Sequence, residues 1–265
     1  MKDILLVVRD DAGQVARLGL AITVAELLGA TISCIDITQM SESQHNGIGQ
    51  DADTLSGVIR QNSEANHKVI DRALTKRSID HRWINMSGSP IDSLSEEAAF
   101  HDLLIVDAHL RDRAWRDSSF VISELARATN QPLLLVPDGQ VEDDFASHAT
   151  IAWDGSRPCI AATRAAVPLL SKTRTVTIVE FGKHRRGPSI ERGAEYLRRQ
   201  GIIVHSTHED SLRDPAHWLT ARCQPGRTSY CVMGAFGHSR SHEAVFGGVT
   251  LAMLEEAKIP LFVAH

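Results

Sequence analysis

The sequence lacks long apolar runs, clustered cysteines and an excess of basic residues, and each absence narrows the class of protein. No run approaches the roughly 18 apolar residues that a membrane span needs, and Met1-Lys2-Asp3 leads into an expected strand rather than a signal peptide. The net charge of −5 argues against general nucleic-acid binding. The four cysteines are scattered and form no C-x-x-C pair, so we expect reduced thiols in a cytoplasmic protein.

Motifs of common enzyme classes are also missing. The sequence has no G-x-x-x-x-G-K-[ST], which excludes a P-loop enzyme. Ser156 does not lie in a G-x-S-x-G elbow, which argues against hydrolase chemistry. His238 and His242 are four residues apart, as two metal ligands on a helix would be, but no third ligand has a clear spacing. We therefore expect neither a catalytic residue nor a metal site.

What the sequence does contain is a regular alternation of short apolar runs and helical patterns. The 265 residues, 43% hydrophobic and 23% charged, are enough for two small domains. Strands are expected at 4–8, 31–37, 81–84, 103–106 and 133–136, and again at 149–153, 176–179, 202–206, 229–233 and 261–264. Helices are expected between them at 15–28, 54–76, 91–100 and 119–129, and at 158–170, 190–200, 215–223 and 251–257, with 41–53 as a loop. Pro168 should kink or end its helix.

The alternation runs twice, which predicts two similar halves. The strand at 104–106 corresponds to that at 230–233, and P-L-L-L-V at 132–136 corresponds to P-L-F-V at 260–263. We expect one domain at 1–138, a polar linker at 139–147 and a second domain at 148–265. The pattern predicts parallel α/β sheets with helices on both faces and ligands at the carboxyl ends of the strands.

Glycines gather after the fourth expected strand of the second half. Gly234 and Gly237 follow that strand, and Gly247 and Gly248 precede the last helix. A backbone without Cβ can approach an anion closely or adopt positive φ angles, and a helix N-terminus favours phosphate. Alternatively, these glycines only shape two turns, and their spacing alone does not decide between the two readings.

An acidic residue follows the first strand of the same half. The carboxylate of Asp154 could accept hydrogen bonds from two ribose hydroxyls, as acidic residues do in dinucleotide-binding folds. The alternative is that Asp154 or Ser156 caps the next helix. The combination with the glycines favours the ribose, because Asp154 and Gly234 would face each other across one crevice if the first and fourth strands are neighbours.

These residues resemble the nucleotide motif of the universal stress protein family. That motif reads G, two residues, G, nine residues, G and then Ser or Thr, and Gly234, Gly237 and Gly247 keep this spacing. The chain resembles a tandem universal stress protein over almost its whole length. Gly248 stands where the family has Ser or Thr, which removes a hydroxyl that would meet a phosphate. Thr250 and Ser239 are the candidates to replace it.

The resemblance implies a fold and a ligand. The fold would be two tandem Rossmann-like domains of the adenine nucleotide alpha hydrolase type, each a five-stranded parallel sheet of order 3-2-1-4-5. The domains would form a pseudo-dimer through their fifth strands, 133–136 and 261–264, and two chains could form a homodimer. Covering these apolar edge strands would also prevent aggregation. The ligand would be ATP, ADP, AMP or another adenine nucleotide, with or without Mg²⁺.

The resemblance also implies which residues bind. Asp154 would hold the ribose, Ala152 would lie near the adenine, and Phe181 would meet the base. The other expected nucleotide-binding residues lie on the phosphate side: Met233, Gly234, Gly237, His238, Ser239, Gly247, Gly248, Val249 and Thr250. His238 with Arg240 could add positive charge there, or both could lie on a solvated loop.

The first half departs further from the family motif. Asp10 and Asp11 follow its first strand, but Asp107 replaces the first glycine and Leu110 the second. An extra carboxylate and a bulky leucine both oppose a polyphosphate. We therefore expect this half to have the fold without a nucleotide site.

Three functions remain open from the sequence. The first is a nucleotide-binding stress protein, in which the ligand orders the 237–247 loop and signals to a partner. The second is a slow ATPase at the same site, for which Glu243 and His242 are the only nearby candidate bases. The third is a scaffold that has lost its nucleotide, with Gly248 as the mark of that loss.

Overall fold

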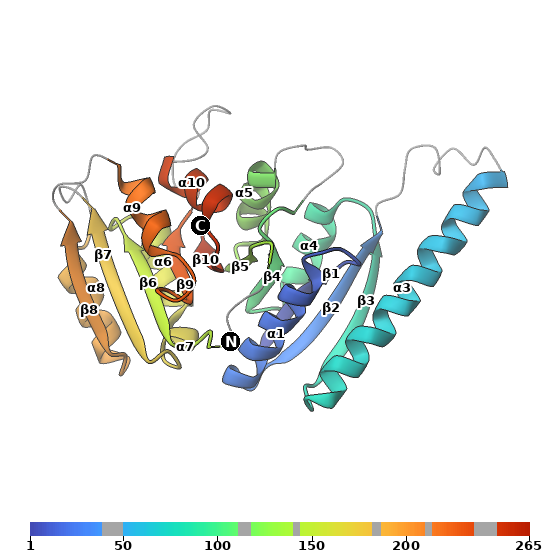
Figure 1. Cartoon of the computed structure of the whole chain (residues 1–265), viewed down its shortest axis with the longest axis horizontal. Coiled ribbons are helices and arrows are strands. Elements are labelled where there is room, and N and C mark those ends of the chain that lie inside the picture. The colour runs from blue at the N-terminus through green and yellow to red at the C-terminus, as the bar shows by residue number, and fades with distance from the viewer. Residues whose placement is uncertain (39–49, 111–117, 140–143, 182–186, 210–213, 236–247) are drawn as a thin grey trace.

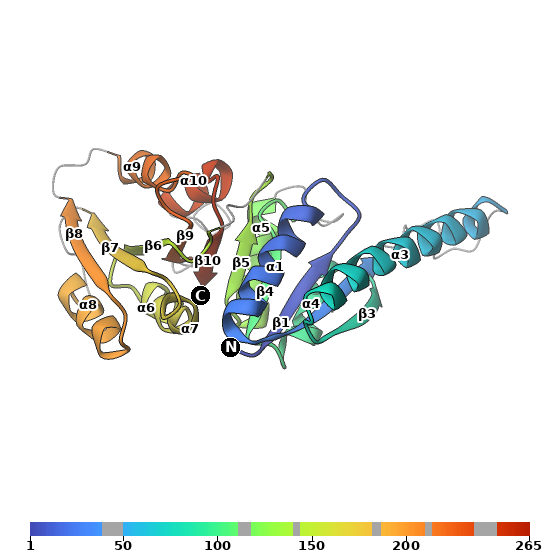
Figure 2. The same cartoon turned by 60° about the horizontal axis from the view of Figure 1, so that its bottom comes forward.

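Ten strands form one sheet with helices on both faces in a computed structural model of the chain (Figures 1 and 2). The structure describes residues 1–38, 50–110, 118–139, 144–181, 187–209, 214–235 and 248–265. No helix in these ranges is long and apolar enough to cross a bilayer.

Strands and helices alternate in both halves, as predicted. The first half consists of β1 (Asp3–Val8), α1 (Gln14–Leu28), β2 (Thr31–Thr38), α3 (Gln50–Lys76), β3 (His81–Ser87), α4 (Pro90–Ala98), β4 (Leu103–Asp107), α5 (Ser118–Thr129) and β5 (Leu133–Val136). The second consists of β6 (His148–Trp153), α6 (Arg157–Ala165), α7 (Val167–Leu170), β7 (Thr175–Phe181), α8 (Ile190–Arg199), β8 (Val204–Glu209), α9 (Pro215–Arg222), β9 (Tyr230–Gly234), α10 (Gly248–Glu256) and β10 (Leu261–Ala264).

The strand order is β3-β2-β1-β4-β5-β10-β9-β6-β7-β8. Neighbouring strands are parallel within each half, so each half has the order 3-2-1-4-5 and the predicted fold class is confirmed. The two halves meet where β5 pairs antiparallel with β10, with Leu134 opposite Phe262. The sheet therefore continues through both halves.

Local sequence explains where several elements end. Gly29 ends α1 with φ of 59°, a left-handed angle that glycine adopts without strain, and its N–H bonds to the Ala25 carbonyl. The helix predicted at 158–170 divides at Ala166 into α6 and α7, and Pro168 lies in the first turn of α7. The prediction that Pro168 would kink or end its helix is confirmed. Helix α3 begins at Gln50, earlier than predicted, and most of the predicted 41–53 loop lies outside the described residues.

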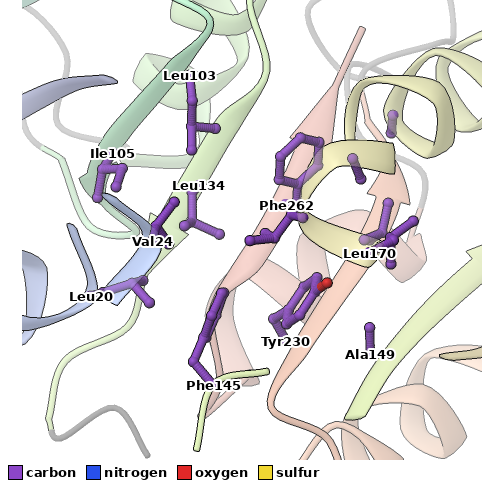
Figure 3. Packing of buried hydrophobic residues seen from close by; sticks show 14 of the residues in the cluster. Leu20, Val24, Leu103, Ile105, Leu134, Phe145, Ala149, Leu170, Tyr230 and Phe262 are labelled. Atoms are coloured by element: carbon purple, nitrogen blue, oxygen red, sulfur yellow. The ribbon is translucent and has the colours of Figure 1, made fainter. Parts of the chain in front are cut away.

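Each face of the sheet carries one hydrophobic cluster. The α1-side cluster lies under α1, α3, α6, α7 and α8, and includes Leu20, Val24, Leu134, Tyr230 and Phe262. The α9-side cluster lies under α4, α5, α9 and α10, and includes Leu94, Val121, Leu219, Met233 and Val263. Figure 3 shows the α1-side cluster passing from α1 across β5 and β10 toward α7. The two halves therefore share a core, which holds them together beyond the strand pairing.

The end of the predicted linker packs against the second half. Phe145 is 1% exposed and stacks on Tyr230, with ring centroids 4.6 Å apart. The Arg174 N–H donates to the Ala146 carbonyl, and the hydroxyl oxygens of Ser147 and Ser229 lie 2.7 Å apart. Residues 144–147 of the predicted linker thus pack against the second half, although their polar sequence resembles a linker.

Candidate functional site

The candidate site lies at the carboxyl ends of β6, β7 and β9. β6 lies between β7 and β9, and Ala152 pairs in register with Met233. Asp154 follows β6 directly, Gly234 is the last residue of β9, and Phe181 is the last residue of β7. The first and fourth strands of this half are therefore neighbours, as the prediction required.

Asp154 has a place in the turn that leads into α6. Its Oδ1 accepts a hydrogen bond from the Ser156 N–H at 2.9 Å. Ser156 is the N-cap of α6, and its hydroxyl accepts from the Cys159 N–H at 3.3 Å. The capping alternative is thus observed at Ser156. The Asp154 side chain is exposed and remains accessible to a ligand.

A buried thiol lies directly behind this turn. Cys159 is 1% exposed, and its Sγ donates to the Ala152 carbonyl at 3.5 Å. Burial raises the pKa of the Cys159 thiol to about 12, and the negative charge of Asp154 adds to the rise. Because the thiolate is the reactive form of cysteine, burial and the raised pKa both disfavour nucleophilic reaction at Cys159.

Gly234 is explained by a close contact between β9 and α6. A Cβ at this position would lie 2.2 Å from the Cys159 nitrogen and 2.7 Å from its Cα. Gly234 is the last residue of β9, one residue beyond the predicted strand end, and it does not have positive φ, which argues against the alternative that it shapes a turn. Its missing side chain lets the first turn of α6 pack directly on the strand.

An aromatic pair lies on the α9 side of the site. Phe181 and Trp218 meet edge to face with centroids 5.1 Å apart, and the Arg222 guanidinium lies 5.6 Å from the Trp218 ring centroid. Ala152 and Phe181 both pack against the α9-side cluster. Sequence reasoning missed Trp218, although a tryptophan four residues before an arginine in a short helix is a usable signal.

The structure describes only some of the residues that were expected to bind the phosphates. Gly237, His238, Ser239 and Gly247 lie outside the described residues, as do His242 and Glu243. Gly248, Val249 and Thr250 form the first turn of α10.

The three residues of that turn differ in exposure. Gly248 is exposed, and no atom of a described residue lies within 4 Å of the position that its Cβ would take. Val249 packs against the α9-side cluster. Thr250 is only 9% exposed, which leaves little of its side chain for a ligand. Of the described residues, Gly248 therefore offers the most open position on this side.

Known structures match the whole chain, whereas no protein-family model and no curated protein matches its sequence. A universal stress protein from Archaeoglobus fulgidus superposes with a TM-score of 0.76 at 14% identity, covering 99% of this chain and 97% of that one. The chain has the universal stress protein fold. A putative universal stress protein from Pseudomonas aeruginosa gives 0.61 at 13% identity, covering 100% of this chain and 93% of that one. A functionally unknown protein from the same species gives 0.58 at 14% identity, with 100% and 92% covered.

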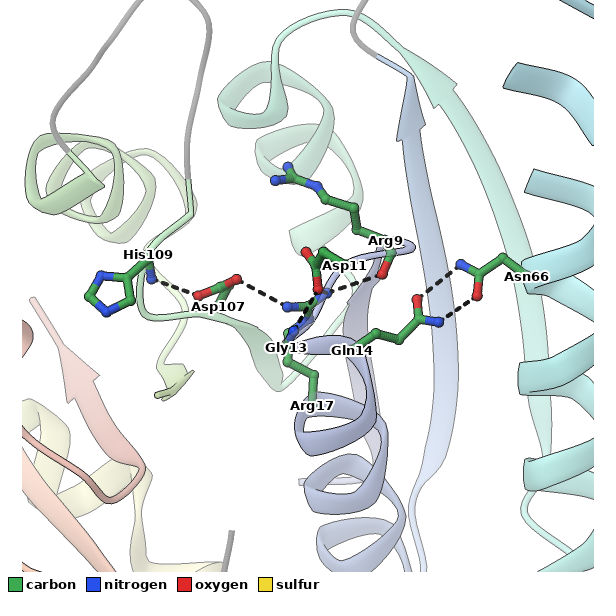
Figure 4. A network of polar contacts seen from close by, with 8 residues as sticks. All are labelled: Arg9, Asp11, Gly13, Gln14, Arg17, Asn66, Asp107 and His109. Atoms are coloured by element: carbon green, nitrogen blue, oxygen red, sulfur yellow. Dashed lines mark hydrogen bonds and ion pairs between the residues drawn. The ribbon is translucent and has the colours of Figure 1, made fainter. Parts of the chain in front are cut away.

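In the N-terminal half of this universal stress protein fold, an ion-paired network takes the corresponding place (Figure 4). Arg17 is 2% exposed, and its guanidinium donates to Asp107 Oδ2 at 3.0 Å and to Asp11 Oδ1 at 2.8 Å. Asp107 Oδ1 also accepts from the His109 N–H at 2.7 Å, and Leu110 is 1% exposed. The carboxylate that replaces the first motif glycine is thus neutralised within the protein.

Loop length explains why the two halves differ at this position. Residues 9–13 separate β1 from α1, whereas only residues 154–156 separate β6 from α6. The shorter loop brings the first turn of α6 onto Gly234. The longer loop leaves room for the Asp107 side chain and for Arg17 beside it. The universal stress protein fold therefore carries two different arrangements at equivalent strand ends.

Proposed function

We propose that this chain is a tandem universal stress protein that binds an adenine nucleotide, ATP, ADP or AMP, in its C-terminal half. The observation that carries the proposal is the register of Ala152 with Met233, which brings Asp154 and Gly234 to the same ends of neighbouring strands. In open α/β sheets, ligands bind beyond the carboxyl ends of the strands.

Different residues of the site would contact different parts of the nucleotide. Asp154 would accept hydrogen bonds from the ribose hydroxyls. Ala152 and Phe181 would contact the base, and the half-buried Trp218 extends the apolar surface beside Phe181. The phosphates, with Mg²⁺ where it is bound, would meet main-chain donors of a set that begins at Met233 and Gly234, continues through Gly237, His238, Ser239 and Gly247, and ends at Gly248, Val249 and Thr250.

The N-terminal half would serve as a structural partner. We propose that residues 1–138 and 148–265 are two domains joined as an intrachain pseudo-dimer, a view that the β5–β10 pairing supports. The Arg17 network supports the absence of a nucleotide site from the first domain, because Asp107 is already ion-paired. Nucleotide binding would act on residues 237–247 and thereby signal to a partner protein.

Calorimetry on the full chain tests this function. ATP, ADP and AMP are titrated with and without Mg²⁺, and small molecules released from the freshly purified protein are identified by mass spectrometry. Asp154→Asn keeps an oxygen for the Ser156 N–H but removes the charge, so the fold should remain while the affinity falls by about tenfold, as for a lost charge-assisted hydrogen bond.

The matched control is Asp10→Asn, which changes an exposed aspartate after the first strand of the other half. It should leave nucleotide affinity unchanged. Equal losses in both variants would show that the effect is not local to the Asp154 site. An intact protein that binds none of the three nucleotides would overturn the proposal.

A further inference from the structure

A second candidate site lies on the α1 side of the C-terminal half. A pocket of about 210 Å³ opens between α6 and α8. Trp153 lines it and belongs to the α1-side cluster, whereas the preceding Ala152 packs against the α9-side cluster. Successive residues of a strand point to opposite faces of the sheet. The pocket therefore lies on the α1 side of the sheet, whereas Ala152 and Phe181 of the proposed nucleotide site pack on the α9 side.

The floor of the pocket is rigid. A Cβ at Gly193 would lie 2.9 Å from Trp153 Cη2 and 3.1 Å from Ile178 Cδ1, so α8 lies as close to the sheet as a glycine allows. Trp153 is 4% exposed, and its indole N–H donates to the Pro188 carbonyl at 3.2 Å. The pocket is thus preformed around a fixed indole, which lowers the entropic cost of binding.

The rim of the pocket concentrates positive charge. Three arginines line it, Arg164 from α6 and Arg192 and Arg199 from α8. Within the described ranges, none of the ion pairs involves these three side chains. The half-buried Tyr196 also lines the pocket, and its hydroxyl makes no hydrogen bond to another described residue. In a chain of net charge −5, this cluster attracts anions locally.

We infer that this pocket binds a small phosphomonoester that carries an apolar or aromatic group. Guanidinium groups pair with phosphate oxygens through parallel hydrogen bonds, and the phenol of Tyr196 can donate another. Trp153 and Ile160 provide the apolar wall for the organic group.

The size of the pocket limits the ligand. The volume of about 210 Å³ lies below the range of about 300–1,000 Å³ that is typical of sites for drug-sized ligands. A phosphate with one small ring is therefore the size of ligand that we expect.

Titration of the full chain with phenyl phosphate tests the inference, with inorganic phosphate and phenol as the two partial ligands. Phenyl phosphate should bind saturably and more tightly than either partial ligand, and less tightly at high salt because exposed charges are screened. Binding no tighter than that of inorganic phosphate would overturn the assignment of an apolar group. An absence of phenyl phosphate binding would overturn the site itself.

Paired variants locate the binding. Arg192→Gln with Arg199→Gln removes two exposed guanidinium groups and should weaken phenyl phosphate binding by about tenfold or more, as expected for charge-assisted hydrogen bonds. Arg157→Gln removes an exposed arginine of α6 that does not line the pocket and should have little effect. Equal losses in the two variants would show only a general effect of charge and would overturn the site.

The indole N–H signals in NMR spectra test the location of the ligand independently of its affinity. Phenyl phosphate should shift the signal of Trp153, which is identified by its loss in Trp153→Phe, and should leave that of Trp218 in place. A shift of Trp218 instead of Trp153 would place the ligand on the α9 side and overturn the inference. The arginine variants should keep the indole spectrum of the unliganded protein, which confirms that they fold.

Discussion

The guanidinium of Arg17 lies 3.0 Å from the carboxylate of Asp107, at the strand end where the C-terminal half has Gly234. Asp107 ends β4 and Gly234 ends β9, each the fourth strand of its half. In the N-terminal half, a buried guanidinium occupies this position between two carboxylates. In the C-terminal half, a helix packs there directly on the backbone of a glycine.

Replacing Arg17 should destabilise the protein strongly. Arg17→Met leaves Asp11 and Asp107 without their counter-charge, and breaking a buried ion pair costs about 3 kcal/mol. Urea unfolding should show a lower midpoint at neutral pH. The control is Arg77→Met, whose pair with Glu26 is exposed and should contribute less than about 1 kcal/mol. Similar midpoints for the two variants would contradict the role of Arg17.

Adding one methyl group at Gly234 should have a far larger effect than adding it at Gly248. The Gly234→Ala methyl meets the α6 backbone, and overpacking of this kind costs about 1–3 kcal/mol. The Gly248→Ala methyl meets no described residue within 4 Å at the start of α10, where alanine favours the helix by about 0.5–1 kcal/mol. The midpoint of thermal unfolding should therefore fall in Gly234→Ala and rise in Gly248→Ala. If Gly234→Ala leaves the stability unchanged, α6 moves away from the added methyl group without loss of folding free energy.

The missing hydroxyl at position 248 can be restored. Gly248→Ser and Gly248→Ala both add a Cβ at a position that no described residue approaches within 4 Å. If this turn meets phosphate, the serine variant should bind ATP several-fold more tightly than the alanine variant, since a net hydrogen bond contributes about 0.5–1.5 kcal/mol. Calorimetry of the two variants measures the difference. Equal affinities would remove position 248 from the proposed site.

His148 should make the protein less stable below neutral pH. Burial lowers the pKa of His148, and the positive charges of Arg222 and His205 lower it further. Its Nε2 lies 2.9 Å from the Thr177 hydroxyl. A lowered pKa in the folded state means that the unfolded state binds the proton first. The contribution of His148 is therefore present above pH about 6.5 and is lost as pH falls through the folded pKa.

Two measurements check the His148 prediction. NMR titration of its ring should give a pKa below 6.5, the unperturbed value. The loss of stability between neutral pH and pH about 5 should be smaller in His148→Gln, which cannot titrate. A ring pKa at or above the unperturbed value would reverse the sign of the effect and contradict the prediction.

Phe145 should stabilise the second half although it lies in a polar segment. Its side chain is 1% exposed and stacks on Tyr230, so Phe145→Ala should cost about 3–5 kcal/mol. Phe100 is 88% exposed, and Phe100→Ala should change stability by less than about 0.5 kcal/mol. The midpoint of thermal unfolding of the full chain should therefore be lower in Phe145→Ala than in Phe100→Ala. Equal midpoints for the two variants would show that Phe145 is dispensable.

The local sequence pattern predicted most of the strands and helices. The hydrophobic periodicity of these elements, and residues such as Pro168 that end a helix, can be recognised within a few residues of sequence. The resemblance to the universal stress protein family then implied the strand order that the pairing of Ala152 with Met233 exemplifies. The contacts of Gly234 with Cys159 and of Arg17 with Asp107 were not predictable in the same way. They join residues far apart in the chain, and their geometry depends on how closely a helix approaches a strand.

The site was predicted less completely than the fold for the same reason. Asp154 and Gly234 were selected as candidates because they lie at or directly after the ends of strands. Each also has a structural role that depends on the neighbouring helix α6. Trp218 was missed because its partner Phe181 comes from a distant strand. The burial of Phe145 was missed because a single aromatic residue in a polar stretch carries no periodic signal.

The antiparallel pairing of β5 with β10 has a consequence for how this molecule responds to dilution. Two separate subunits that met through such strands would dissociate at low concentration, whereas tethering within one polypeptide keeps the local concentration of each partner high. The stoichiometry is thereby fixed at one to one. The two linked strand ends can then differ in sequence, and here the N-terminal one has Asp107 where the C-terminal one has Gly234.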